Sequence, residues 1–262
     1  MKKIRLFVWI ISLILACLCL SASICFPTYY MSCMIAIIIL LFLNFSLKRK
    51  EINEIRNIII EYFNDCDVNK YINKLDNFKR RCFFTKNQKK FFNLYNVTAY
   101  IDKGEFEKAK DILLDIDTTV KNINSLSQFI YLKNWCDYFF HKRLDEKMKY
   151  TLVKMSNIIN ANKNKRIKMQ LIQMFQNTSA KYEILINGSI PEVKNYIYAR
   201  KQFETTLYQK LNTNYLLALI DLRTNNVPEA MIKLRELSEY NKDLYICKEA
   251  KSILTKIESA SI

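Results

Sequence analysis

The sequence of 262 residues is poor in the residues that interrupt helices. It contains 2 glycines and 3 prolines, far below average usage. β-Sandwiches and nucleotide-binding α/β folds depend on glycine-rich turns, so this scarcity argues against both fold classes. The Gly-x-Gly-x-x-Gly, Walker-type and Gly-x-Ser-x-Gly patterns are also missing from the sequence. We therefore expect an all-α protein that is not an enzyme and that uses no cofactor.

Residues that bind metals are few or scattered. The single histidine is His141, and the 8 cysteines include no Cys-x-x-Cys pair. A zinc or iron–sulfur site is therefore not expected. We interpret His141 as a surface residue at a helix end, beside Lys142 and Arg143. The alternative, a general base, lacks a nearby carboxylate–cysteine arrangement.

Charge is almost missing from the first 47 residues, whose only charged side chains are Lys2, Lys3 and Arg5. Residues 6–26 form an uncharged run of 21 residues, and residues 29–47 form another of 19. As helices these runs would each be about 30 Å long, which matches the hydrocarbon core of a bilayer. We predict a transmembrane helical hairpin with its turn at Pro27-Thr28. The alternative, a cleaved signal peptide, would have a shorter apolar stretch and no second one.

Positive charges flank both predicted spans. Lys2, Lys3 and Arg5 precede the first span, and Lys48, Arg49 and Lys50 follow the second, while the loop between them is uncharged. The positive-inside rule then places both termini in the cytoplasm. We expect a two-span protein of the cell membrane in which residues 48–262 form a cytoplasmic domain. Lys48, Arg49 and Lys50 are candidates for contact with anionic lipid headgroups.

The predicted domain repeats one turn pattern. Gly104, Gly188 and Asn225 tolerate the left-handed conformation that follows a helix. Pro191 and Pro228 fall in the first turn of the next helix, where a missing N–H is harmless. Fainter copies bring the equivalent positions to five, spaced by 38, 39, 45 and 37 residues: Tyr71, Ala109, Met148, Val193 and Ala230. A period of this size, made of two helices, is typical of an α-solenoid.

The same pattern sets the expected helices. We predict about five helix pairs: 48–64 with 68–81, 87–102 with 105–117, 125–141 with 145–161, 165–187 with 191–206, and 208–224 with 228–240. A last helix over 243–259 carries an apolar stripe on one side and lysines elsewhere, as a capping helix would.

Two copies, roughly 92–118 and 212–240, carry a family resemblance. In the first copy the large, turn, aromatic, small and closing apolar positions are Tyr100, Gly104, Phe106, Ala109, Leu113 and Ile116. In the second they are Leu217, Ala218, Asn225, Val227, Ala230, Leu234 and Leu237. The chain here resembles the tetratricopeptide repeat (TPR) family, although the family's closing proline is absent. The resemblance implies stacked antiparallel helix pairs with a concave groove that binds peptides or proteins.

If the family register holds, nine residues face this groove: Thr98, Ile101, Lys133, Asp137, Tyr182, Leu185, Tyr215, Leu219 and Arg223. The resemblance thus predicts a membrane-anchored, cytoplasmic TPR-like scaffold or adaptor with a protein or peptide partner. The alternative is a structural subunit of a larger membrane complex, such as a transporter or secretion assembly. Small and polar residues of the first span would then pack against other helices, namely Ser12, Ala16, Ser21, Ala22 and Ser23.

The formal net charge of +16 leaves two interpretations open. It could be a solvated surface in a lysine-rich protein, or it could attract anionic lipid headgroups. Basic clusters lie at residues 48–50, 79–81, 86–90 and 163–168. Nucleic acid is a disfavoured partner, because no recognisable nucleic-acid-binding module accompanies the charge.

Overall fold

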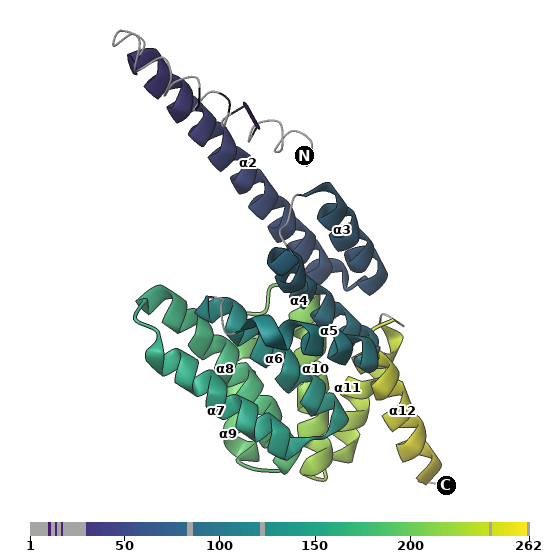
Figure 1. The fold of residues 1–262 in the computed structure, drawn as a ribbon. Helices are drawn as coiled ribbons and strands as arrows, with labels where there is room; N and C mark the ends of the chain where they lie inside the picture. The colour runs from purple at the N-terminus through teal and green to yellow at the C-terminus, as the bar shows by residue number, and fades with distance from the viewer. Residues whose placement is uncertain are drawn as a thin grey trace. The chain divides into compact units, whose positions relative to one another are not determined.

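The computed structural model describes residues 10, 11, 14, 17, 30–82, 86–120, 124–240 and 243–260. These residues contain helices and short turns and no β-strand, so the predicted all-α class is confirmed (Figure 1). The helices within this part are α2 (Tyr30–Asp65), α3 (Val68–Arg81), α4 (Lys86–Lys103), α5 (Phe106–Val120), α6 (Ser125–Lys142), α7 (Asp145–Ala161), α8 (Lys165–Ile186), α9 (Ile190–Lys201), α10 (Leu207–Arg223), α11 (Val227–Glu239) and α12 (Tyr245–Ala260).

The chain divides into two compact units. The first unit comprises residues 1–60 and 73–85, and the second comprises residues 61–72 and 86–262. Within the first unit, Arg81 of α3 forms an ion pair with Glu54 of α2. The predicted helices over 29–47 and 48–64 are one continuous helix, α2.

The predicted membrane hairpin falls on residues that are only partly described. The first span, 6–26, lies outside the described residues except for Ile10, Ile11, Ile14 and Cys17. The second span corresponds to the first half of α2, where Phe42 is 68% exposed. Among the helices of the described residues, none is both long enough and apolar enough to cross a membrane. The two-span hairpin therefore remains a prediction from the sequence.

Four hairpins of the second unit turn in the same way. The residues after α4, α6, α8 and α10 with positive φ are Gly104 (86°), Arg143 (55°), Asn187 (56°) and Asn225 (56°). Each donates its N–H to the carbonyl three residues earlier, and the next residue donates to the carbonyl five residues earlier. This pair of hydrogen bonds is the Schellman motif, which satisfies the last carbonyls of a helix. The turns are therefore structurally equivalent.

The helices that follow these four turns, and also α3, begin in the same way. The amides of Tyr71, Ala109, Met148, Val193 and Ala230 donate to the carbonyls four residues earlier, which close the first turn of each helix. All five side chains are buried, with exposed fractions from 0% to 6%. Each of the five is the fourth residue of its helix, and their equivalence as repeat positions remains a prediction from the sequence.

Two details of the prediction are wrong. The left-handed residue in the third hairpin is Asn187, and Gly188 comes one residue later. Helix α9 ends at Lys201, whereas the pattern predicted a helix to residue 206. Residue 206 instead belongs to a capping box that starts α10. Thr206 Oγ1 accepts from the Gln209 amide, and the Thr206 amide donates to the Gln209 side chain.

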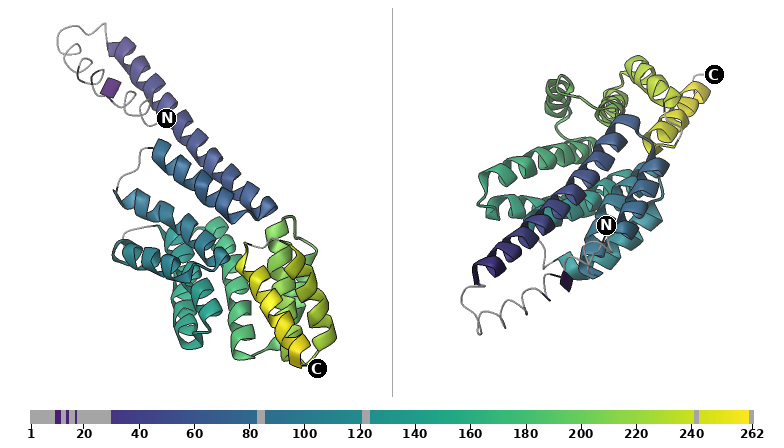
Figure 2. Two further views of the ribbon diagram at one scale, coloured as in Figure 1. Left: turned by 90° about the vertical axis from the view of Figure 1, so that its right-hand side faces the viewer. Right: turned by 90° about the horizontal axis from the view of Figure 1, so that it is seen from above.

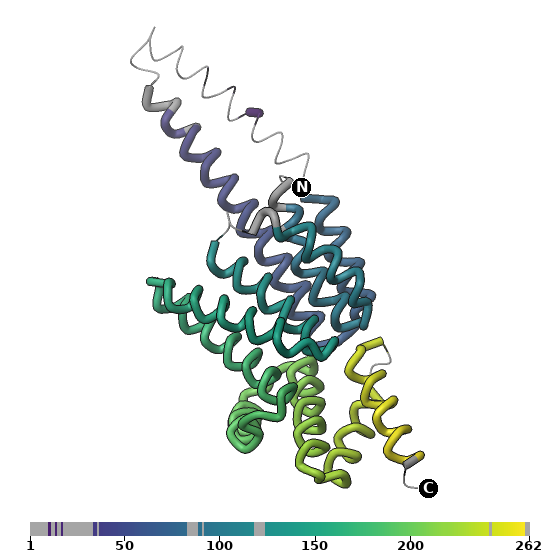
Figure 3. Tube along the Cα trace, turned by 60° about the horizontal axis from the view of Figure 1, so that its bottom comes forward, coloured from purple at the N-terminus to yellow at the C-terminus, as the bar shows by residue number. Residues whose placement is uncertain are grey.

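Helices of the second unit pack in pairs and then against the next pair. Contacts join α4 with α5, α6 with α7 and α10 with α11, and further contacts join α4 with α6 and α6 with α8 (Figures 2 and 3). A core forms around Val97, Leu113 and Ile116, with Tyr245 of α12 packed against it. The expected capping helix, α12, therefore contacts α4 and α10 as well as α11.

Candidate functional site: a cavity between four helices

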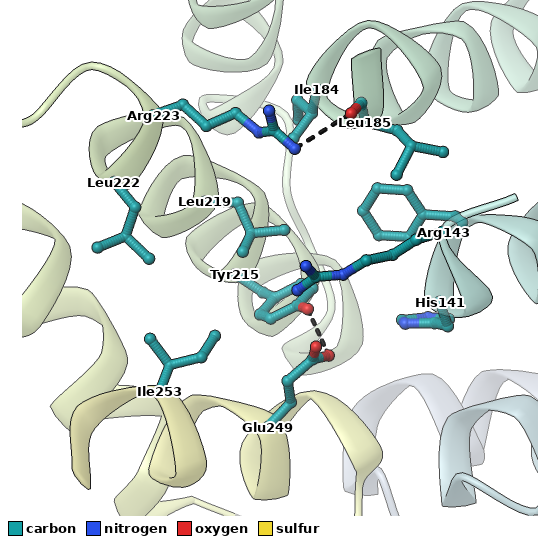
Figure 4. Close-up of a pocket in the computed structure, with 11 residues that line it drawn as sticks. His141, Arg143, Ile184, Leu185, Tyr215, Leu219, Leu222, Arg223, Glu249 and Ile253 are labelled. Atoms are coloured by element: carbon teal, nitrogen blue, oxygen red, sulfur yellow. Dashed lines mark hydrogen bonds between the residues drawn. The ribbon is translucent and has the colours of Figure 1, made fainter. Parts of the chain in front are cut away.

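A cavity of about 280 Å³ opens between α6, α8, α10 and α12 (Figure 4). Its polar lining consists of His141, Arg143, Tyr215, Arg223 and Glu249. Its apolar lining consists of Phe140, Ile184, Leu185, Leu219, Leu222 and Ile253. The site thus combines an aliphatic wall with groups of both charges.

The helix geometry explains which side chains meet here. Tyr215, Leu219 and Leu222 are spaced by four and three residues, so they lie on one face of α10. The contributions of α6 and α8, Phe140 and Leu185 among them, come from the last turn of each helix. The C-terminal ends of helices carry partial negative charge, which an arginine offsets. Arg223 does this directly by donating to the Leu185 carbonyl at 3.1 Å.

The two arginines differ in their bonding. Arg223 is held by the Leu185 carbonyl, whereas the Arg143 guanidinium makes no ion pair or hydrogen bond with any described residue. Arg143 is exposed and stands at the left-handed turn position, where the equivalent hairpins have glycine or asparagine. In Figure 4 its guanidinium extends toward Tyr215 and Glu249. The cavity therefore contains one cation that is available to a ligand.

The Glu249 carboxylate in the cavity accepts a hydrogen bond from a tyrosine. Tyr215, buried on α10, donates its hydroxyl to Glu249 Oε2 at 2.5 Å. Burial, then the charge of Glu249 and this hydrogen bond, raises the pKa of Tyr215. Burial and the same carboxylate raise the pKa of Tyr245 to about 12. Both phenols are therefore neutral and act as hydrogen-bond donors at ordinary pH.

His141 is not the surface histidine that the sequence suggested. Its ring packs against Phe106, Phe140 and Tyr245, with centroid distances of 5.7, 5.3 and 5.0 Å. The Nδ1 atom is buried without a hydrogen-bond partner among the described residues. Burial, and then the charge of Lys181, lowers the pKa of His141 to about 3. The imidazole is therefore neutral and serves as part of the aromatic packing.

Beside the cavity, α6 and α8 share a buried ion network. Asp137 contacts Lys133 and Lys181, with both N–O distances 2.6 Å, and its side chain is 10% exposed. Burial alone would raise the pKa of Asp137, but the two lysines hold it well below the usual range. A similar arrangement surrounds Asp221 of α10, which contacts Lys194 and Lys233 at 2.9 Å each.

A half-buried carboxylate joins helices that are distant in the sequence. Asp102 of α4 accepts hydrogen bonds from Tyr62 at 2.5 Å and from Tyr208 at 2.9 Å. Burial raises the pKa of Asp102 to about 6 against the effect of both hydrogen bonds. These side chains bridge α2, α4 and α10.

Of the nine predicted groove residues, four line the cavity and five lie elsewhere. Leu185, Tyr215, Leu219 and Arg223 line the cavity. Lys133 and Asp137 belong to the ion network, Ile101 is a core residue with 3% exposure, and Thr98 donates to Asn134 Oδ1 at 3.2 Å. Tyr182 is half-buried on α8 and is not among the lining residues. The candidate lipid contacts Lys48, Arg49 and Lys50 are exposed on α2.

Sequence reasoning missed Arg143, Glu249 and His141 as members of the site. For Arg143 a signal existed, because this residue occupies a turn position that glycine or asparagine fills in the other copies. Glu249 lies on the helix that was expected only to cap the domain, and nothing in its local sequence points to Tyr215.

In comparisons with protein-family models, with curated proteins and with solved structures, no match to this chain was found. The described residues also contain no group of three or more His, Cys, Asp or Glu side chains placed to hold a metal ion. The chemistry of the cavity is therefore the main guide to function.

Proposed function

We propose that this chain is a TPR-like helical scaffold, and not an enzyme, that binds a protein or peptide segment in the cavity between α6, α8, α10 and α12. Two observations support this proposal. Four hairpins share one turn geometry, as stacked repeats would. Four of the residues expected to face a groove line a single cavity.

The observation that carries the proposal is the composition of that cavity. Its volume of about 280 Å³ is slightly below the roughly 300–1,000 Å³ that encloses a drug-sized ligand. Such a site is suited to anchor one or two side chains of a larger partner. Leu185, Leu219 and Leu222 would receive an aliphatic side chain, and Arg143 would bind an acidic one.

The test uses the full chain purified in detergent and a random heptapeptide display library. Enriched peptides should place an acidic residue near an aliphatic one. Their affinity should fall about tenfold or more in Arg143→Gln, since a charge-assisted hydrogen bond contributes roughly 1.5–3 kcal/mol. Leu222→Gln should weaken binding by removing part of the aliphatic wall.

The matched control is Arg235→Gln, which removes the same charge from an exposed residue of α11 that pairs with Glu258. This variant should bind the peptides as the unmodified chain does. The proposed binding function would be refuted if the library yielded no enriched peptides. It would also be refuted if both cavity variants bound the enriched peptides as tightly as the unmodified chain does.

We also propose that the N-terminal residues tether this scaffold to the cell membrane with both termini in the cytoplasm. The support is the apolar run itself and the exposure of Ile38 (59%), Phe42 (68%) and Phe45 (64%) on α2. Apolar area left in water is unfavourable by about 25 cal/mol per Å². A lipid environment would remove that penalty, and Lys48, Arg49 and Lys50 would meet the headgroups.

Membrane association is tested by flotation of the full chain with phosphatidylcholine vesicles in a density gradient. Triple substitution of Ile38, Phe42 and Phe45 by serine should reduce the floating fraction. Serine at Leu114, Tyr198 and Ile232, which are exposed on α5, α9 and α11, serves as the matched control and should leave flotation unchanged. Equal flotation of both variants would contradict the tether.

The second candidate function is a structural subunit of a larger membrane complex. The same exposed apolar residues of α2 favour it, because other membrane helices could cover them as well as lipid does. Replacing residues 1–47 by an unrelated two-span hairpin separates the two functions. An adaptor should keep its peptide binding and its cellular role, whereas a subunit should lose its association with the complex.

A further inference from the structure

The segment from residue 147 to residue 182 contains eight basic residues and no acidic residue. The chain as a whole has 25 aspartates and glutamates, so a stretch of 36 residues without one is a marked segregation of charge. The basic residues are Lys147, Lys149, Lys154, Lys163, Lys165, Arg166, Lys168 and Lys181. This segment spans most of α7, the turn after it and most of α8.

Only one of these cations is neutralised by a carboxylate. Lys181 pairs with Asp137 at 2.6 Å. The other seven make no ion pair with a carboxylate of the described residues. Five of them lie between the middle of α7 and the first turn of α8, and we call these the α7–α8 basic face: Lys154, Lys163, Lys165, Arg166 and Lys168.

Large apolar side chains are exposed on the same two helices. Tyr150 is 64% exposed and Val153 is 56% exposed on α7, and Met169 is 60% exposed on α8. Tyr150, Val153 and Lys154 are three and four residues apart, so they lie on one face of α7, and Arg166 and Met169 are related in the same way on α8. Helices α7 and α8 pack against each other (Figure 1), and each of them carries exposed apolar and basic side chains.

We propose that the α7–α8 basic face, with Tyr150, Val153 and Met169, binds the surface of an anionic phospholipid membrane. Each lysine or arginine near such a surface contributes about 1 kcal/mol, which is roughly a fivefold gain in affinity. Val153 and Met169 enter the boundary between headgroups and acyl chains, as the apolar side chains of interfacial helices do.

A nucleic acid would satisfy the charges but not the apolar residues. Base stacking requires aromatic rings. Of the three exposed apolar side chains only Tyr150 is aromatic, and the Lys154 Nζ already lies over its ring, 4.4 Å from the centroid. Lipid is therefore the partner that uses the whole face.

The test measures the acetylation rate of individual lysines in the full chain by mass spectrometry. The chain is compared in nanodiscs of phosphatidylcholine alone and of phosphatidylcholine mixed with phosphatidylglycerol. Lys154, Lys163, Lys165 and Lys168 should be modified about fivefold more slowly with the anionic lipid. High salt should abolish this protection, because it screens charges at a solvated surface.

Exposed lysines elsewhere in the same molecule provide the internal control. Lys201, Lys210, Lys248, Lys251 and Lys256 lie on α9, α10 and α12, and their rates should be equal in the two lipids. Unchanged rates at the α7–α8 basic face, or equal protection of both sets, would overturn the inference.

Two variants with the same loss of charge sharpen the test. One replaces the five residues of the α7–α8 basic face by glutamine, and the other replaces the five control lysines. Lys147 and Lys149, which are exposed on α7, should also be protected by anionic lipid in the unmodified chain. The first variant should lose this protection, and the second should retain it. If the protection persists in the first variant, the face does not bind the membrane.

A third arm distinguishes the partners. Protection of the face by a short DNA duplex, without protection by anionic nanodiscs, would refute the lipid assignment. The readout is also independent of the proposed tether, because Lys48 and Lys50 on α2 report that contact separately. If anionic lipid protects Lys48 and Lys50 but not the lysines of the α7–α8 basic face, this inference is wrong and the proposed tether is unaffected.

Discussion

Tyr208 donates its hydroxyl to Asp102 at 2.9 Å across 106 residues of sequence. A second phenol, Tyr62, donates to the other oxygen of the same carboxylate. Asp102 therefore links α4 to α10 and to the end of α2. These three helices belong to different helical hairpins. The second unit is stabilised by this bridge and by the ion network of Asp137.

Replacing Tyr208 by phenylalanine should destabilise the fold by roughly 1–3 kcal/mol, because one oxygen of a half-buried carboxylate would lose its donor. The pKa of Asp102 should rise further above about 6 in this variant, since one hydrogen bond that lowers it is gone. Urea unfolding followed by circular dichroism measures the first effect. Tyr198→Phe, at an exposed residue of α9, is the control and should change the midpoint little.

Asp137 between its two lysines predicts a larger effect. Asp137→Asn would leave Lys133 and Lys181 close together with no counter-charge, and the expected loss of stability is roughly 3 kcal/mol. The exposed pair Arg235 and Glu258 gives the contrast, and Glu258→Gln should change stability by about 0.5 kcal/mol or less. Equal effects of the two substitutions in urea unfolding would contradict the structural role assigned to Asp137.

Local sequence pattern predicted most of this architecture because helices and their turns are local structures. The helices α3 and α7 have the predicted bounds, and the turn position recurs at Gly104 and Asn225. The error at α9 came from a local signal that was overlooked, the capping box between Thr206 and Gln209.

The candidate site was only partly predictable because it depends on contacts between distant residues. The alignment with the repeat family placed Leu185, Tyr215, Leu219 and Arg223 together, and all four line the cavity. Nothing local to Glu249 indicates that its carboxylate meets Tyr215 from another helix. In the same way, the bridge from Asp102 to Tyr208 could not be read from either helix alone.

His141 and Asp102 predict opposite effects of pH on stability. The pKa of His141 is lowered to about 3 from 6.5, so its contribution to stability is complete above pH 6.5 and is lost as the pH falls below that value. The pKa of Asp102 is raised to about 6 from 3.8, so protonation of the folded state adds stability as the pH falls through 6. Between pH 6 and 5 the two effects should largely cancel.

The variant His141→Phe keeps an aromatic ring between Phe106 and Tyr245 but cannot be protonated. Its stability should therefore increase as the pH is lowered from 6.5 to 5, while that of the unmodified chain changes little. Asp102→Asn should show the opposite slope, with stability falling over the same range. Urea midpoints at several pH values measure both slopes, and parallel curves for the three proteins would contradict these assignments.

Arg143 predicts a conflict between stability and binding. At φ 55° a side chain with a Cβ is strained, by about 1–2 kcal/mol for residues other than glycine, and asparagine tolerates this conformation best among the others. Arg143→Asn should thus stabilise the fold by about 0.5–1 kcal/mol and weaken binding of acidic peptides about tenfold. The reverse substitution at the equivalent turn, Asn225→Arg at φ 56°, should destabilise by a similar amount without affecting peptide binding. Such a pattern is expected where a strained residue is retained for function. If Arg143→Asn left both stability and peptide affinity unchanged, Arg143 would be an ordinary turn residue and would not bind acidic side chains in the cavity.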